Sequence, residues 1–244
     1  RVRAQERPLR SRAMSPRSRT SRHLVVAALV AVPLLAGCGS DDGGSDTSSD
    51  RSSEGSAPAG TCEYRESGEA AREVEPPPAE PTVTEDTRAT ITTTNGDLDV
   101  TLFGADAPCT VGSFVSLAEQ GFYDDTPCPR ITTMPGFELL QCGDPTGTTS
   151  GGPGYEFDDE LSGDETYGAG TLAMANAGPG TNGSQFFIVY GDTQLSPDYT
   201  VFGTVSADSL SVIEEIAADG DDGSNPAGGG APVTPIDIVS IAVS

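Results

Sequence analysis

Arg130 is the side chain of this sequence best suited to place a fixed positive charge inside a folded domain. It is the only basic residue between residues 89 and 244, a stretch rich in Asp and Glu. A guanidinium stays charged at neutral pH and carries several hydrogen-bond donors in a rigid plane. Arg130 is therefore a candidate donor to an acceptor on a bound molecule. The alternative interpretation is a surface arginine in an ion pair.

The cysteines are the second set of residues whose types and number suggest chemistry. If Cys38 near the N-terminus is set aside, four remain: Cys62, Cys109, Cys128 and Cys142. An even number in an exported chain favours disulfides, and three pairings are possible. We favour Cys109–Cys128 and Cys62–Cys142. A metal site is the competing interpretation, but the spacings contain no C-x-x-C pair and the single histidine is His23. We expect neither a metal nor a cofactor.

The charge of the chain excludes one class of partner. All 13 basic residues are arginines, and residues 1–37 hold eight of them with a single acid, Glu6. The whole chain has a net charge of −24, so the part after residue 37 lies near −31. Binding to nucleic acid needs clustered Lys and Arg, which this part lacks. We therefore expect no nucleic-acid partner.

The first 37 residues are typical of a signal peptide. Three arginines precede the apolar run of residues 24–36, which is short and contains Pro33, so a permanent transmembrane helix is less favoured. The run closes as Leu35-Ala36-Gly37-Cys38, which resembles a bacterial lipobox. We expect cleavage before Cys38, a lipid on its thiol, and an extracytoplasmic protein anchored to the outer face of the cell membrane. An ordinary signal peptide or an uncleaved anchor is the alternative, and Met14 is an alternative start.

Residues 38–81 are expected to form a disordered acidic linker behind the lipidated cysteine. They are rich in Gly, Ser, Asp, Glu and Pro, and such a composition cannot bury enough apolar surface to offset its ordering entropy. If Cys62 pairs with Cys142, that disulfide ties part of the linker to the domain. The folded domain is expected to span residues 82–244.

The pattern of the domain predicts many short strands and two helices. Helical spacing of apolar residues indicates helices over residues 108–121 and 209–218, and residues 219–230 are expected to form a mobile loop. β-branched residues, alternation and turn signals indicate strands, which favours a closed antiparallel barrel or a sandwich. The predicted strands are residues 88–94, 98–103, 130–133, 137–141, 171–175, 186–189, 201–205 and 236–243.

Residues 170–187 carry a specific resemblance. They read GTLAMANAGPGTNGSQFF and are followed by VFG at residues 201–203. Upstream lie Pro129-Arg130-Ile131 and, after Phe137, Gln141-Cys-Gly-Asp144. In order and spacing these motifs resemble the cyclophilins over roughly residues 88–243. The resemblance implies a mainly β fold, a closed eight-stranded antiparallel β-barrel capped by two α-helices.

The resemblance also implies a peptidyl-prolyl cis–trans isomerase acting on proline-containing polypeptides. Arg130 would donate to the prolyl nitrogen of the twisted bond, a state that a fixed donor binds better than the planar one. Gln141 and Gln185 would grip the peptide backbone, and Asn176 would offer its own backbone groups. The small Ala175 would line a neighbouring subsite. The walls of an apolar proline pocket would be Phe137, Phe187, Leu195 and Tyr199.

Three positions depart from the eukaryotic pattern of the family. Gln194 stands where many eukaryotic cyclophilins carry Trp, which predicts weak binding of cyclosporin-type inhibitors. Tyr199 replaces a histidine and keeps an aromatic wall. Phe137 lies four residues before Gln141 rather than three, so either a β-bulge absorbs the extra residue or Glu138 occupies the pocket position.

Three functional hypotheses remain open at this point. The first is an active isomerase that acts on exported proteins. The second is a proline-peptide-binding module or chaperone without useful catalysis, and the third is a structural surface lipoprotein. Nothing in the sequence suggests an obligate oligomer, so we expect a monomer.

Overall fold

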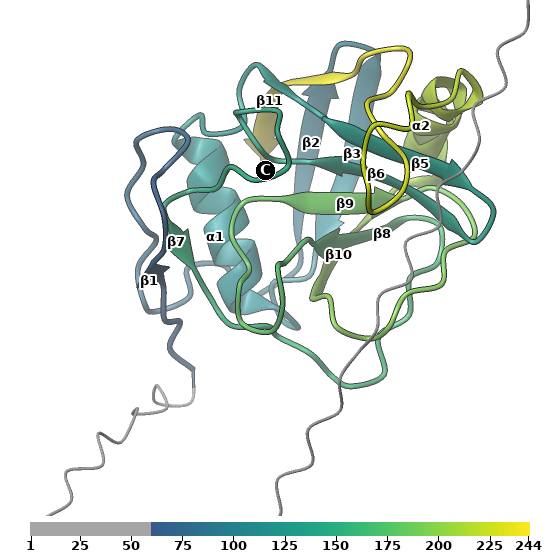
Figure 1. Ribbon diagram of the computed structural model, residues 1–244. Coiled ribbons are helices and arrows are strands. Elements are labelled where there is room, and N and C mark those ends of the chain that lie inside the picture. Colours follow the sequence, from purple (N-terminus) through teal and green to yellow (C-terminus); the bar gives the residue numbers. More distant parts are fainter. Residues whose placement is uncertain (1–59) are drawn as a thin grey trace, which may run out of the picture. The chain divides into compact units, whose positions relative to one another are not determined.

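The computed structural model describes residues 60–244. In this part of the chain two helices and eleven strands follow one another (Figure 1). The predicted signal peptide, Cys38 and the first part of the predicted linker lie outside the described residues. The elements are β1 (Arg65–Glu66), β2 (Thr87–Thr93), β3 (Gly96–Leu102), α1 (Pro108–Glu119), β4 (Thr126–Pro127), β5 (Arg130–Met134), β6 (Phe137–Cys142), β7 (Tyr155–Glu156), β8 (Thr171–Met174), β9 (Phe186–Val189), β10 (Val201–Val205), α2 (Ala207–Ala218) and β11 (Asp237–Val243).

Nine of these strands form one curled antiparallel sheet in the order β4-β11-β2-β3-β10-β8-β9-β6-β5. The eight predicted strands and both helices are present within a few residues of their expected bounds. The expectation of a closed eight-stranded barrel is corrected in two respects. The sheet has a ninth strand, β4, and within residues 60–244 no pairing joins β4 to β5. β4 has two residues and ends in Pro127, so no alternating pattern marks it in the sequence.

Local sequence explains where the main elements begin and end. The β2–β3 hairpin turns at Asn95-Gly96, where Gly96 has a φ of +146°, and the strands then alternate buried and less buried residues. Pro108 starts α1, where a missing N–H costs nothing, and Ser206 caps α2 by accepting from the Ser209 N–H. The two helices pack on the same core, α1 at the left end and α2 at the right end of the curled sheet in Figure 1.

The main core fills the space enclosed by the sheet and the helices. Its largest fully buried side chains include Phe114 of α1, Phe186 of β9 and Phe202 of β10. The Phe114 ring centroid lies 5.6 Å from that of Phe186 and 5.4 Å from that of Phe202. A second, smaller apolar cluster lies on the other face of β6 and β9 and forms part of the candidate site.

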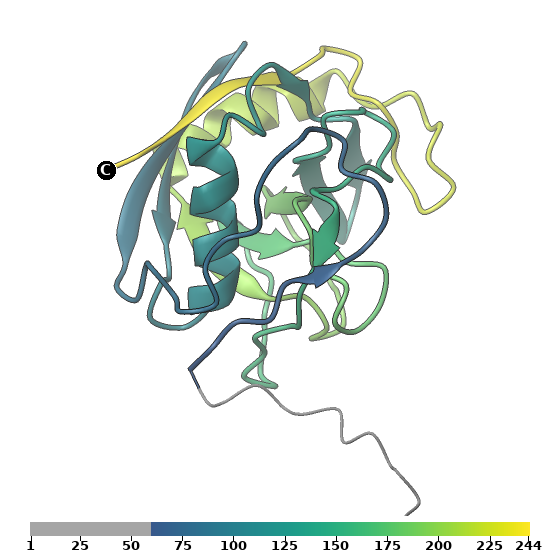
Figure 2. The ribbon, with the colours of Figure 1, turned by 90° about the vertical axis from the view of Figure 1, so that its left-hand side faces the viewer.

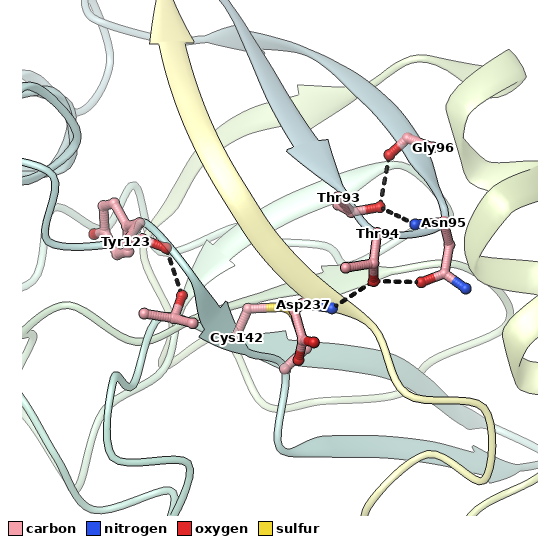
Figure 3. The surroundings of a disulfide bond; sticks show 9 residues. Thr93, Thr94, Asn95, Gly96, Tyr123, Cys142 and Asp237 are labelled. Carbon is pink, nitrogen blue, oxygen red and sulfur yellow. Dashed lines mark hydrogen bonds between the residues drawn. A yellow bond between two sulfur atoms is a disulfide. The ribbon is translucent and has the colours of Figure 1, made fainter.

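The disulfide pairing that we favoured is wrong. Cys62 pairs with Cys109 at the start of α1, and Cys128 pairs with Cys142. Arg130 and Gln141 face each other across β5 and β6. Cys128 lies two residues before Arg130, and Cys142 follows Gln141 directly. This register therefore brings both cysteines to one end of the hairpin. Figure 3 shows Cys142 near Asp237 at the start of β11. Sequence spacing carries no register information, which is why the pairing could not be read from it.

The linker also ends earlier than expected. Residues 60–81 were assigned to it, but β1 pairs with β7 in a small two-stranded sheet and Cys62 is buried. Figure 2 shows this segment, in dark blue, running beside α1. In the part of the chain that the structure describes, no helix is long and apolar enough to cross a membrane.

Candidate active site

Arg130 and Gln141 form the centre of the candidate site. They are directly opposed in the β5–β6 ladder, and Arg130 Nη1 donates to Gln141 Oε1 at 3.0 Å. Successive side chains of a strand point to opposite faces, so Phe137, Leu139 and Gln141 share one face. The Arg130 Cζ atom lies 5.4 Å from the centroid of the Phe137 ring, within the range of a cation–π contact. The structure thus brings Arg130, Phe137 and Gln141 together.

Glu138 points away from this group. The β5–β6 pairing runs without a register shift from Arg130↔Gln141 to Met134↔Phe137, so the bulge, one of the two alternatives that the spacing left open, is absent from this ladder. The Glu138 carboxylate accepts from the Asp192 N–H at 2.7 Å, in the loop that follows β9. Phe137, rather than Glu138, therefore faces Arg130.

The segment between α2 and β11 holds the Arg130 guanidinium from its other side. Nε donates to the Gly228 carbonyl at 2.9 Å and Nη2 donates to the Ala227 carbonyl at 3.1 Å. This is the segment that we expected to be a mobile loop, and Figure 1 shows it crossing in front of β6 and β9. Nη1 and Nη2 each carry a second N–H that none of these bonds uses.

Arg130 does not form the surface ion pair that was the alternative interpretation. Within residues 60–244 the ion pairs are those of Arg65 with Glu156 and Asp158. Partial burial lowers the pKa of Arg130 below its ordinary value, and the nearby Tyr199 opposes this shift. The guanidinium remains charged at neutral pH, because its ordinary pKa lies far above 7.

An apolar cluster lies beside Arg130. Phe187 is buried, and the half-buried Tyr199 packs on it edge to face, with ring centroids 5.5 Å apart. The predicted wall residues all belong to this cluster, together with the predicted Ala175. Its buried members are Leu139, Tyr167, Ala173, Phe187 and Val189, and its partly buried members are Phe137, Ala175, Leu195, Tyr199 and Val201.

Sequence reasoning missed Leu139 and Tyr167. Leu139 lies between Phe137 and Gln141 on the same strand face, so strand alternation could have found it. Tyr167 follows β7 in a loop with no periodicity, and no sequence signal pointed to it. Its hydroxyl donates to the Tyr199 carbonyl and accepts from the Tyr199 N–H, both at 3.0 Å, which fixes the backbone of Tyr199.

A chain of amide hydrogen bonds extends from Arg130. Gln141 Nε2 donates to Gln185 Oε1 at 2.8 Å, and Gln185 Nε2 donates to the Gly151 carbonyl at 2.9 Å. Both predicted glutamines are therefore at the site, and each is oriented by its neighbour. Because Arg130 can only donate, Gln141 must turn its oxygen toward Arg130 and its nitrogen toward Gln185.

The Gly151 end of this chain is organised by Asp144. The buried Asp144 carboxylate accepts from the backbone N–H groups of Thr146, Thr148, Ser150 and Gly151, at 2.8, 3.1, 3.1 and 3.0 Å. Burial alone would raise the pKa of Asp144, but the hydrogen bond from the Thr146 hydroxyl and those from the backbone N–H groups outweigh this effect and hold the pKa below its ordinary value.

Asn176 and Gln194 complete the set of predicted positions. The Asn176 side chain donates to the Asp198 carbonyl at 2.9 Å, which leaves its backbone as the part available to a ligand. Gln194 is exposed, and its backbone N–H donates to the Gly136 carbonyl at the tip of the β5–β6 hairpin. Within the described residues no group of His, Cys, Asp and Glu has the arrangement of a metal site.

Comparison with known proteins shows the family of the chain. Residues 88–243 match the family model described as cyclophilin type peptidyl-prolyl cis-trans isomerase/CLD. The chain is 48% identical over 164 residues to the probable peptidyl-prolyl cis-trans isomerase B of Mycobacterium tuberculosis, covering 61% of this chain and 52% of that protein. It is 44% identical over 177 residues to peptidyl-prolyl cis-trans isomerase A of the same organism, covering 64% and 91%. The chain thus spans about half the length of the first of these relatives.

Solved structures give the same result. A cyclophilin type peptidyl-prolyl cis-trans isomerase of Cryptosporidium parvum superposes with a TM-score of 0.58 at 34% identity, covering 65% of this chain and 98% of that one. A structure of the same Cryptosporidium protein in the presence of the dipeptide Ala-Pro gives a TM-score of 0.57 at 35% identity. This chain belongs to the cyclophilin-type peptidyl-prolyl cis-trans isomerase family.

Proposed function

We propose that this chain catalyses the cis–trans isomerisation of X–Pro bonds in exported polypeptides. The observation that carries the proposal is the convergence of Arg130, Gln141 and Phe137 on one strand face, beside the cluster of Phe187 and Tyr199. A charged hydrogen-bond donor suits the prolyl nitrogen, an amide side chain suits the peptide backbone, and an apolar wall suits the proline ring. The named activity of the relatives supports the same reaction.

The chemistry follows from the peptide bond itself. Rotation about an X–Pro bond must cross a barrier of about 18–20 kcal/mol, which arises largely from amide resonance. No bond breaks, so neither a nucleophile nor a metal is required. When the bond twists, the prolyl nitrogen regains its lone pair and becomes a better acceptor. A donor held beside that nitrogen binds the twisted state more tightly than the planar state and lowers the barrier.

Arg130 has the geometry for this role. Hydrogen bonds to Gly228, Ala227 and Gln141 already fix its guanidinium, so the side chain need not move to donate to the nitrogen of a twisted X–Pro bond. The N–H groups that those bonds leave unused are available to the substrate. The apolar side chains around Phe187 and Tyr199 would hold the proline ring, while Gln141, Gln185 and the backbone of Asn176 would hold the peptide on either side of the rotating bond.

Measurement of exchange rates in a short Ala-Pro peptide by NMR exchange spectroscopy tests the proposal. The wild-type chain should accelerate exchange well above background. Arg130→Ala should lower kcat/KM by about a hundredfold or more, the scale of losing one donor to a transition state. Arg130→Lys should restore only part of it, because an ammonium lacks the planar fork.

Arg88→Ala is the matched control, because Arg88 is exposed on β2 and belongs to no part of the site. It should leave kcat/KM unchanged. A folded wild-type chain that does not accelerate exchange would reject the proposal, and peptide binding without acceleration would favour the binding-module hypothesis. Equal rates for Arg130→Ala and wild type would reject the role of Arg130 alone.

We also propose that the domain is held at the outer face of the cell membrane by a lipid on Cys38, and that it works as a monomer. Cys38 lies outside the described residues, and the support is the lipobox-like sequence that ends in it. The two disulfides of the domain also fit a chain that folds outside the reducing cytoplasm. Fatty-acid labelling of the wild-type chain that persists in Cys38→Ala would contradict the anchor, and a sedimentation mass of two chains would contradict the monomer.

A further inference from the structure

A cavity adjoins the apolar cluster of the candidate active site. It has a volume of about 500 Å³, and Gln141, Gln185 and Ala175 of the candidate site form part of its lining. Ser67, Gly68 and Glu69 form another part of the lining. These three residues precede residue 88, at which the match to the family model begins. One wall of the cavity is therefore supplied by a segment of this chain outside the family-matched region.

Backbone contacts hold this wall, residues 67–69, at both ends. Before it, β1 pairs with β7, and the Ser67 N–H donates to the Gly154 carbonyl at 2.9 Å. After it, the Ala71 N–H donates to the Gly152 carbonyl at 2.8 Å. The Cys62–Cys109 disulfide ties the start of the segment to α1. The wall is thus part of the folded domain.

Side chains next to the wall strengthen its attachment. Arg65 Nη2 donates to the Gly180 carbonyl at 2.7 Å, and Arg65 Nη1 lies 2.9 Å from the Asp158 carboxylate. The Tyr64 ring packs edge-on against Tyr155 and Phe157, with centroid distances of 5.5 Å to each. These contacts leave the position of Glu69 set by the domain rather than by a flexible tail.

The charge of the cavity is negative. Its lining contains two carboxylates, Glu69 and Glu156, and no Lys, Arg or His. The Glu156 carboxylate is shared with Arg65 at 3.9 Å and accepts from the Ser67 hydroxyl at 2.9 Å. Glu69 is exposed, and within residues 60–244 its carboxylate has no hydrogen bond or ion pair. Its charge is therefore uncompensated by the protein.

We propose that Glu69, in the wall that residues 67–69 add to this cavity, selects a Lys or Arg side chain near the isomerised X–Pro bond of the substrate. The inference rests on the proposed function, because the cavity shares Gln141, Gln185 and Ala175 with the isomerase site. A peptide that lies across those residues places a neighbouring side chain in the cavity. A basic side chain then meets a free carboxylate, whereas an acidic one meets a like charge.

Peptides of one length with a central Ala-Pro unit test the proposal. Each carries a single Lys, Gln or Glu at one of the flanking positions, and exchange spectroscopy of the 244-residue chain gives kcat/KM without a coupling protease. At one position Lys should exceed Gln by about two- to fivefold, the size expected for an exposed charge pair. At about 1 M salt, where the screening length is about 3 Å, this preference should disappear.

Glu69→Gln should bring the ratio of kcat/KM for the Lys peptide to kcat/KM for the Gln peptide close to one. Glu69→Lys should lower this ratio below one. Glu73→Gln is the matched control, because Glu73 is exposed on the same segment and does not line the cavity. It should keep the full preference. The proposal is overturned if no position prefers Lys, or if Glu69→Gln leaves the preference unchanged.

The Gln peptides separate this inference from the proposed function. If they are accelerated and the Lys preference is absent, the isomerase proposal stands and the proposal for Glu69 falls. If no peptide is accelerated, the isomerase proposal falls. NMR titration then gives the Kd values of the Lys and Gln peptides, and the ratio of these Kd values replaces the ratio of kcat/KM values as the test of the role of Glu69.

Discussion

Phe137 shows how strand parity decides which residue meets Arg130. An even separation from Gln141 keeps Phe137 on the Gln141 face, whereas Glu138, at an odd separation, turns to the other face and binds the loop after β9. A one-residue difference from the eukaryotic spacing therefore requires no bulge. The position of Phe137 follows from the regular pairing of β5 with β6.

Asp144 is the residue that connects loop structure to the site. It accepts from four backbone N–H groups of the loop that ends at Gly151, and the Gly151 carbonyl orients Gln185. The bonds require an acceptor with several lone pairs, which a carboxylate provides and an amide provides only in part. The orientation of Gln141, and through it that of Arg130, depends on this loop.

Asp144→Asn should lower the free energy of unfolding at pH 7 by about 1–3 kcal/mol, the cost of leaving buried N–H groups unsatisfied. The pKa of Asp144 is depressed in the folded state, so its charge stabilises the fold above the unfolded pKa of about 4. This stabilisation is lost as the pH falls through the folded pKa. Urea unfolding at several pH values should therefore show the gap between wild type and variant narrowing below about pH 4.

Asp97→Asn is a suitable control, because Asp97 is exposed on β3. It should change the unfolding free energy by less than about 0.5 kcal/mol. A gap between wild type and Asp144→Asn that stayed constant down to pH 2 would contradict the account of the Asp144 charge.

At the scale of elements, the β5–β6 hairpin and the α2–β11 segment act together. Ile131 exchanges two backbone hydrogen bonds with Gly230, at 2.8 and 3.0 Å, which docks the segment against β5. The docked segment then presents the Gly228 and Ala227 carbonyls to Arg130. The guanidinium is thus oriented by two elements that are far apart in the sequence.

Gly229→Ala should disturb this docking and lower kcat/KM by roughly tenfold, a loss of about 1.4 kcal/mol of transition-state stabilisation. Gly229 has a φ of +71°, and a Cβ there would lie 2.1 Å from the Ile131 carbonyl oxygen, so the backbone must shift. Isomerase rates and unfolding free energies of the variant measure the effect.

Gly223→Ala provides a closely matched control. Gly223 lies in the same segment with a φ of +65°, but a Cβ there meets no atom within 4 Å. Both variants should bear a similar backbone cost of about 1–2 kcal/mol, and only Gly229→Ala should slow isomerisation. Equal rates for the two variants would show that docking at Gly229 does not matter for Arg130.

At the scale of the whole described domain, the N-terminal segment is joined to the body at several points. The Cys62–Cys109 disulfide closes a separation of 47 residues, and the β1–β7 pair and Arg65 add noncovalent contacts. The segment makes one wall of the cavity beside the candidate site, so the proposed selection by Glu69 depends on this attachment as well.

The double variant Cys62→Ala with Cys109→Ala should lower the unfolding free energy by about 2–4 kcal/mol, because the unfolded chain regains entropy. Loosening of residues 67–69 should weaken the preference for Lys peptides, while kcat/KM for Gln peptides stays near the wild-type value. Unfolding curves and the peptide series measure both effects. An unchanged unfolding free energy, or a loss of rate for all peptides alike, would contradict this division.

The sequence by itself determined the family, the eight longer strands and both helices, and it pointed to most residues of the candidate site. Strand alternation and turn chemistry are local, so the bounds of β2, β3 and α1 could be read from neighbouring residues. The motif that contains Asn176 and Gln185 provided the most specific resemblance to the family. Arg130 stood out because the acidic domain contains no other cation after residue 88.

Only the tertiary structure decided the remaining features, because each depends on register or on contacts distant in sequence. The disulfide pairing follows from the β5–β6 register, and the choice of Phe137 over Glu138 follows from the same ladder. The two-residue strands β1, β4 and β7 are too short to show a pattern. The contact of Gly228 with Arg130 and the place of Glu69 in the cavity wall each join segments that are far apart in the sequence, and no local sequence pattern predicts such contacts.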